Sequence, residues 1–112
     1  MPNQDPALND VFHALADPTR RAVLQRLGEG PASVKDLSEP FDMALPSFTQ
    51  HLRVLEEGGL IKSKKVGRVR ICEIKPKQLS KAERWFEDQR ALWEGRLDRL
   101  DAYIEDLQKK GP

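Results

Sequence analysis

The sequence predicts a mainly α-helical domain with a small β-hairpin, followed by a long C-terminal helix. Residues 8–57 show apolar side chains at helical spacing, interrupted by Pro and Gly. Residues 61–74 change to an alternating pattern rich in β-branched side chains, which is typical of a hairpin. Residues 78–109 return to helical spacing. With 112 residues, 38% of them hydrophobic and 33% charged, the chain has the composition of one globular domain.

The N-terminal part predicts a tail and two helices. Residues 1–7 are polar and rich in proline, so we expect a flexible tail. A first helix is expected over Leu8–Ala16. Asp17 followed by Pro18 predicts the start of the second helix, because Asp caps a helix and Pro suits its first position. This second helix should end near Gly28.

The next two helices are short and follow one another closely. A loop is expected over 28–32, and Ser33 with Asp36 resembles a capping box. Pro40 should end that helix, and the next helix is expected over 44–57, where two glycines follow. Two short helices joined by a tight corner are the elements of a helix-turn-helix.

The helix at 44–57 has a narrow apolar side and an unusual polar side. Phe48, Leu52 and Leu55 share one side at about 100° per residue, so we expect that side to be buried. Small polar groups, an amide and a guanidinium lie opposite, and such side chains reach base edges and phosphates in a DNA major groove. An ordinary amphipathic surface helix is the alternative. The outward residues are Pro46, Ser47, Thr49, Gln50, Arg53 and Glu57.

The hairpin at 61–74 is expected to turn around Val66-Gly67-Arg68, with Ile61, Val69 and Ile71 facing the domain. A basic hairpin directly after a helix-turn-helix is typical of a wing that contacts a minor groove or its phosphates. The alternative is a hairpin whose charges protect an exposed edge. The side chains expected to project are Lys64, Lys65, Arg68 and Arg70.

Positive charge is concentrated in the same part of the chain. Residues 43–75 carry seven Lys and Arg against three Glu, a net charge of +4, although the whole chain carries only +1. This local excess favours a phosphate-binding face, whereas a charge run can also be simply solvated. Arg20 and Arg21, outside this segment, have two open interpretations, a phosphate contact or a surface salt bridge.

The C-terminal helix carries an apolar seam too long for a small domain to cover alone, and Gly95 is a candidate position for a bend. We therefore expect this helix to meet a second copy of itself, together with Phe12 on the first helix. Trp85, Phe86 and Trp93 could instead line an apolar pocket for a small-molecule effector, although no pattern identifies one. The seam residues are Phe86, Trp93, Leu97, Leu100, Ile104 and Leu107.

Several classes of protein do not fit the sequence. A single cysteine excludes an internal disulfide, and we interpret Cys72 as a packing residue and not a redox sensor, because no second thiol accompanies it. No apolar run approaches the roughly 18 residues of a membrane span, and the N-terminus does not have the pattern of a signal peptide. We expect a cytoplasmic protein without membrane contact. Nothing resembles a nucleophile–base pair or a glycine-rich phosphate loop, so we do not expect an enzyme.

The stretches LADPTRRAVLQRL, MALPSFTQHLRVLEEGGLI and KSKKVGRVRICEI resemble the ArsR/SmtB family of bacterial winged helix-turn-helix repressors over residues 8–75. The resemblance implies a homodimer that is joined by the first and last helices and binds a pseudo-palindromic operator in double-stranded DNA. In this chain the last helix corresponds to the expected dimerisation region 76–112. It assigns base reading to Ser47, Thr49, Gln50 and Arg53, and a mainly structural role to His51.

The sequence departs from the metal-sensing members of that family. Their Cys-x-Cys-Asp-Leu motif is replaced by Ser-Val-Lys-Asp-Leu at 33–37, and residues 76–112 contain no histidine. Soft metals need thiolate or imidazole clusters, so we expect no metal site and no cofactor. The expected function is transcriptional regulation through DNA. The alternative is a winged-helix module that binds only proteins, because a fold does not dictate a function.

Overall fold

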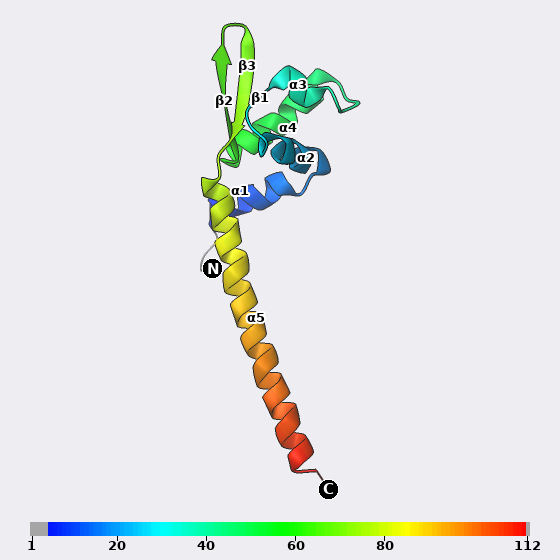
Figure 1. Cartoon of the computed structure of the whole chain (residues 1–112), viewed down its shortest axis with the longest axis vertical. Helices are drawn as coiled ribbons and strands as arrows, with labels where there is room; N and C mark the ends of the chain where they lie inside the picture. Colours follow the sequence, from blue (N-terminus) through cyan, green and yellow to red (C-terminus); the bar gives the residue numbers. More distant parts are fainter. Residues whose placement is uncertain (1–4, 112) are drawn as a thin grey trace. The chain divides into compact units, whose positions relative to one another are not determined.

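The computed structural model describes residues 5–111, and it confirms the predicted fold class (Figure 1). The chain divides into one unit that ends at Ala82 and a second that begins at Glu83. The elements of the first unit are α1 Pro6–Leu15, α2 Pro18–Leu27, β1 Ala32–Ser33, α3 Val34–Ser38, α4 Leu45–Glu57, β2 Ile61–Val66 and β3 Val69–Ile74. The last element, α5, runs over Lys77–Lys109 and enters the second unit.

The first helix begins earlier than the sequence suggested. Residues 1–4 of the expected tail lie outside the described residues, but Pro6 and Ala7 already belong to α1. The Asp5 carboxylate accepts a hydrogen bond from the amide of Ala7 at 2.9 Å. Asp5-Pro6 is therefore the same start signal as Asp17-Pro18, which opens α2 as predicted.

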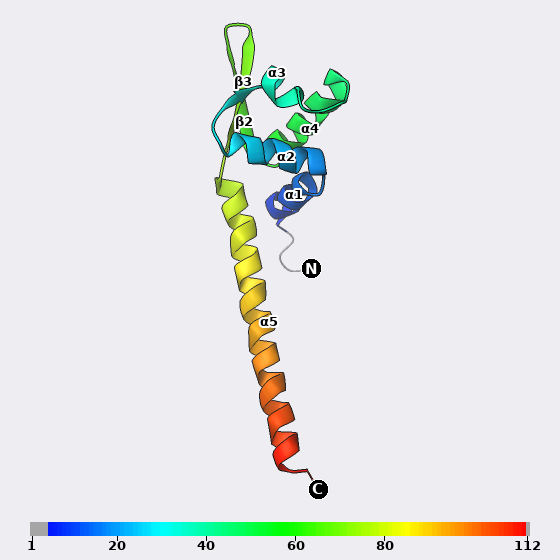
Figure 2. The same cartoon turned by 45° about the vertical axis from the view of Figure 1, so that its right-hand side comes forward.

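One core joins the helices of the first unit to its sheet. Phe48, Leu27, Leu55 and Leu60 are among its largest fully buried side chains. In two views the tip of the β2–β3 hairpin extends beyond the helices of this unit (Figures 1 and 2). The remaining buried residues are Val11, Ala14, Val23, Leu24, Ala32, Leu37, Leu52, Ile61, Cys72 and Ala82.

The predicted hairpin is present, but it belongs to a three-stranded antiparallel sheet with the order β1-β3-β2. The additional strand, β1, pairs Ala32 with Cys72 and Ser33 with Ile71. The prediction of a plain loop over 28–32 is therefore wrong at its last residue. Two residues are too few to show an alternating pattern, so periodicity could not indicate this strand.

The register of the hairpin corrects one prediction. Only Gly67 and Arg68 lie between the strands, and Gly67 has a φ of 64°. This turn pairs Ser63 with Cys72, so the buried Ile61 and Cys72 share one face. Val69 and Ile71 lie on the opposite face, and Val69 is 47% exposed. Placing them inward with Ile61 was wrong, because a shift of one residue in the turn moves every side chain to the other face.

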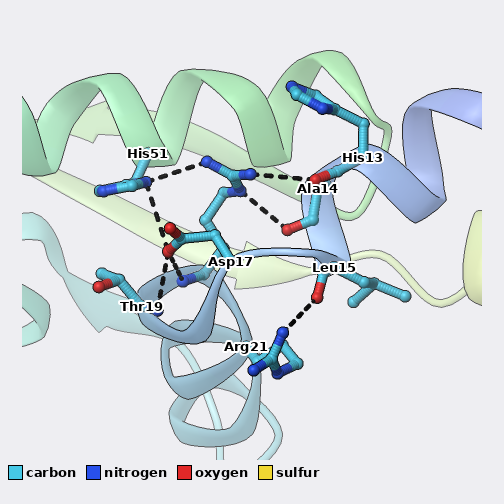
Figure 3. A network of polar contacts seen from close by, with 8 residues as sticks. His13, Ala14, Leu15, Asp17, Thr19, Arg21 and His51 are labelled. Carbon is cyan, nitrogen blue, oxygen red and sulfur yellow. Dashed lines mark hydrogen bonds and ion pairs between the residues drawn. The ribbon is translucent and has the colours of Figure 1, made fainter.

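A polar network joins α1, α2 and α4 (Figure 3). The Arg20 guanidinium donates to the backbone carbonyls of Ala14 at 2.8 Å and His13 at 3.0 Å, and its Nη1 lies 3.1 Å from His51 Nδ1. Arg21 donates to the carbonyl of Leu15 at 2.8 Å. Both arginines thus satisfy carbonyl groups at the C-terminal end of α1, where positive charge is favoured. Neither expected role for them, phosphate contact or surface salt bridge, describes these contacts.

Asp17 completes the network as the N-cap of α2. Its carboxylate accepts from the amides of Thr19 at 2.8 Å and Arg20 at 3.1 Å, and it lies 3.7 Å from His51 Nδ1. Burial acts to raise the pKa of Asp17, but the amide of Arg20, the charge of His51 and the amide of Thr19 outweigh it. The pKa of Asp17 is therefore below its ordinary value of 3.8.

We predict that Asp17→Ala lowers the free energy of unfolding by about 1 kcal/mol at neutral pH, because the cap is removed. A lowered pKa means that the charged form stabilises the fold above the unfolded pKa. That contribution disappears as the pH falls through the folded pKa. Asp17→Ser, which keeps a capping oxygen without a charge, should retain most of the stability. Urea unfolding at one protein concentration, at neutral pH and near pH 3, measures both effects. Equal pH dependence in wild type and Asp17→Ser would contradict the assignment.

Candidate nucleic-acid interface

The rotation of α4 about its own axis is fixed by one buried stripe. Phe48 and Leu55 are 0% exposed and Leu52 is 5% exposed, as predicted. Ala44 has an extended backbone at the N-cap, and Gly58 caps the other end. Because side chains on a helix keep fixed angular positions, burying this stripe turns the opposite side outward.

All four residues assigned to base reading are exposed on α4, namely Ser47, Thr49, Gln50 and Arg53. Arg53 Nη1 donates to Gln50 Oε1 at 3.2 Å, so the amide and the guanidinium are presented side by side. His51 is half-buried and contacts the Arg20 network, which agrees with the structural role expected for it.

A crevice of about 400 Å³ separates α4 from the wing, a name used here for residues 61–74. Ser63 on β2 donates a hydrogen bond to Glu56 Oε1 on α4, and Arg70 on β3 donates to Ser63 Oγ at 3.0 Å. Neither Glu56 nor Ser63 could be identified as a site residue from the sequence, because their roles depend on the register of the hairpin. The polar residues of the crevice are Thr49, Arg53, Glu56, Ser63 and Arg70.

The four predicted basic residues of the wing are exposed, but they do not project together. Lys65 pairs with Arg70, on the face that Ser63 and Cys72 share, whereas Lys64 pairs with Ile71 on the other face. Arg68 lies in the turn. The wing therefore presents positive charge on both faces and at its tip.

Lys62 lies on the outer face of the wing, the face that Lys64 shares, and a carboxylate on the neighbouring strand offsets its charge. Its ammonium lies 3.0 Å from Glu73 Oε1. Hydrogen bonding from Lys62 and its charge hold the pKa of the Glu73 carboxyl below its usual range. Lys62 thus contributes less to the positive field of the wing than its unpaired charge would suggest.

Cys72 lies at the floor of the crevice and is 1% exposed. Burial raises the pKa of its thiol, and the nearby Glu56 carboxylate raises it further. A buried, protonated thiol is poorly reactive, which agrees with its interpretation as a packing residue.

Within residues 5–111, no three or more His, Cys, Asp or Glu side chains are grouped so that they could hold a metal ion. No helix in the same range is long and apolar enough to cross a membrane.

The second unit carries a row of exposed apolar side chains on α5. Its spacing of three and four residues places the row on one side of the helix. Gly95 does not interrupt α5, which is helical from Lys77 to Lys109. Near the start of the row, Phe86 is 51% exposed and packs edge-to-face on Trp85 with ring centroids 5.3 Å apart. The exposed fractions further along are 54% for Trp93, 59% for Leu97, 50% for Leu100, 43% for Ile104 and 51% for Leu107.

Phe12, which was expected at the same dimer contact, lies on α1 in the first unit. It is half-buried and packs against the core. Part of its ring therefore serves the core of its own chain.

Known proteins resemble this chain in both sequence and fold. A helix-turn-helix domain family matches residues 15–64. The transcriptional regulator Rv2034 of Mycobacterium tuberculosis is 36% identical over 70 residues, which cover 62% of this chain and 65% of that protein. The transcriptional repressor SdpR of Bacillus subtilis is 36% identical over 61 residues, which cover 54% of this chain and 68% of SdpR.

A solved structure extends this likeness beyond the helix-turn-helix. The crystal structure of an ArsR family transcriptional regulator matches with a TM-score of 0.79 and 52% sequence identity. The match covers 84% of this chain and 97% of that chain. The chain therefore belongs to the ArsR family of winged helix-turn-helix transcriptional regulators.

Proposed function

We propose that this protein is a homodimeric transcriptional repressor that binds a pseudo-palindromic operator in double-stranded DNA. The observation that carries the proposal is the division of α4 into a buried apolar stripe and an exposed polar face. That face carries an amide, a guanidinium and small hydroxyls, which are the groups that recognise base edges and phosphates. Repression follows from occupying promoter DNA.

In this account α4 lies in the major groove. Gln50 and Arg53 read purine edges, and each good bidentate contact contributes roughly 1–3 kcal/mol of discrimination against a wrong base. Their mutual hydrogen bond of 3.2 Å supports the idea that they read neighbouring positions. Ser47 and Thr49 flank these two residues around the helix axis, and they bind phosphates or read a base.

The wing supplies affinity that does not depend on the base sequence. Lys64, Lys65, Arg68 and Arg70 are exposed on a hairpin whose first strand follows α4 after a short turn. Cations placed there can bind phosphates beside the groove that α4 enters. Such contacts release counterions, so their contribution weakens as salt rises.

The seam of α5 joins two copies of the chain. Trp93, Leu97 and Leu100 are each at least half exposed, as are other members of the row, and a large exposed apolar surface of this kind is typical of an interface. Pairing this seam with itself gives a two-fold symmetric dimer, and two-fold symmetry matches an operator with inverted half-sites. The region 76–112 then acts as a dimerisation element for the DNA-binding part at 8–75.

We predict that replacing both Gln50 and Arg53 with alanine weakens binding to operator DNA by about 10-fold or more, because the variant cannot read the base edges. Binding to unrelated DNA should fall much less. Gel-shift titrations with DNA from the promoter of the protein's own operon and with unrelated DNA measure the two effects. Unchanged specific binding by a folded double variant would contradict the assignment of α4.

Replacing Lys64, Lys65 and Arg68 together with alanine should weaken binding to all DNA sequences alike. The slope of log affinity against log salt should become shallower by about 0.9 for each phosphate that the variant no longer neutralises. Titrations at several salt concentrations provide the measurement. An unaltered slope would exclude contacts between these side chains and phosphates.

A charge in the seam should separate the dimer. We expect Leu97→Glu to shift the protein toward monomer and reduce operator affinity, because a carboxylate would be desolvated in an apolar interface. Arg96→Glu, at the adjacent position in the sequence, serves as the matched control. Sedimentation measures the oligomeric state, and a wild-type protein that is monomeric at working concentration would refute the dimer.

A further inference from the structure

Glu56 is an acidic residue in a crevice whose other charged lining residues, Arg53 and Arg70, are positive. Its carboxylate lines the crevice that Arg53 and Arg70 also line, between α4 and the wing. If this region faces DNA, an isolated carboxylate there would repel phosphates and weaken binding. A residue with an electrostatic disadvantage at a binding surface needs another reason for its position.

The contacts of Glu56 suggest that reason. Its Oε1 accepts the hydrogen bond from Ser63, and the oxygen of the same Ser63 hydroxyl accepts from Arg70 Nη1 at 3.0 Å. A hydroxyl that donates to one partner and accepts from another has a fixed orientation. The three residues come from α4, β2 and β3, so the relay connects the helix to both strands of the wing.

The register of the hairpin makes this relay possible. Ser63 pairs with Cys72, and Arg70 lies one step nearer to the tip on the same face of the ladder. Ser63 and Arg70 are therefore diagonal neighbours across the two strands, within reach of a long side chain. A register shifted by one residue would place Arg70 on the outer face with Lys64, away from Ser63.

We propose that Glu56 is a positioning residue for DNA binding. Acting through Ser63, it holds the Arg70 guanidinium in the crevice beside α4 before DNA arrives. Arg70 uses one of its five N–H donors for Ser63, which leaves four for a backbone phosphate. Fixing the guanidinium in advance reduces the ordering cost of binding. This inference rests on the proposed DNA-binding function.

The proposal predicts an effect opposite in sign to simple electrostatics. If Glu56 only adds negative charge, Glu56→Ala should strengthen binding to every DNA sequence. If Glu56 positions Arg70, Glu56→Ala should weaken binding to the wild-type target about three- to tenfold, as expected when one hydrogen bond is removed. The matched control is Glu57→Ala, which removes a carboxylate from the next position of the same helix. It should leave affinity unchanged or raise it.

Variants of Ser63 separate positioning from general destabilisation. Ser63→Ala should weaken binding at least as much as Glu56→Ala does, because it breaks the same relay and leaves the Glu56 carboxylate in place. The double variant should be no worse than Ser63→Ala alone. Ser63→Thr keeps a hydroxyl and should bind like wild type. The slope of log affinity against log salt should stay close to that of wild type in both alanine variants, because Arg70 still reaches its phosphate in the bound state. Arg70→Ala, which removes the phosphate contact itself, should make the slope shallower by about 0.9.

The probe is a duplex enriched by wild-type protein from random-sequence DNA. If wild type enriches no sequence, the proposed function fails and this inference with it. If wild type binds the duplex and Glu56→Ala binds as tightly as Glu57→Ala, only this inference is overturned. Fully additive effects in the double variant would also overturn it, as would an unchanged salt slope for Arg70→Ala.

Discussion

The burial of a narrow apolar stripe on α4 is the constraint on which the rest of the account depends. Phe48, Leu52 and Leu55 have almost no exposed surface, and each loses its favourable burial if the helix rotates. The rotation of α4 is therefore set by the core. Because the angular positions of side chains follow from that rotation, the burial of the stripe is what turns Gln50 and Arg53 outward.

Polar contacts then hold α4 on both flanks of this stripe. On one flank His51 contacts the Arg20 guanidinium, which also binds carbonyls at the end of α1 (Figure 3). On the other flank Glu56 contacts Ser63 of the wing. The first contact joins α4 to a helix that is distant along the chain, and the second joins it to the strand that follows it. The position of the exposed face is therefore tied to α1 and α2 on one flank and to the hairpin on the other. A surface fixed in this way has less conformational freedom to lose when it binds a partner.

Local signals were enough to predict most elements. Asp17-Pro18, the apolar spacing of α4 and the glycines after it each specify structure through neighbouring residues. The same Asp-Pro signal at Asp5 marks the true start of α1, but the polar, proline-rich residues around it also fit a tail. The strand β1 and the inward face of the hairpin depend on pairing across the sheet, which periodicity alone does not determine. The exposed residues of α4 were predictable because they follow from helical spacing. The relay from Glu56 to Arg70 was not predictable, because it depends on the register of the hairpin.

The most direct test of the account is selection of bound sequences from random double-stranded DNA by the intact protein. Two identical subunits that each present α4 should enrich an inverted repeat. The centres of its half-sites should be separated by a whole number of helical turns, about 10–10.5 base pairs each. Enrichment of such a repeat is the predicted result. A single unpaired half-site, or no enriched sequence from protein shown to be folded, would contradict the central claim.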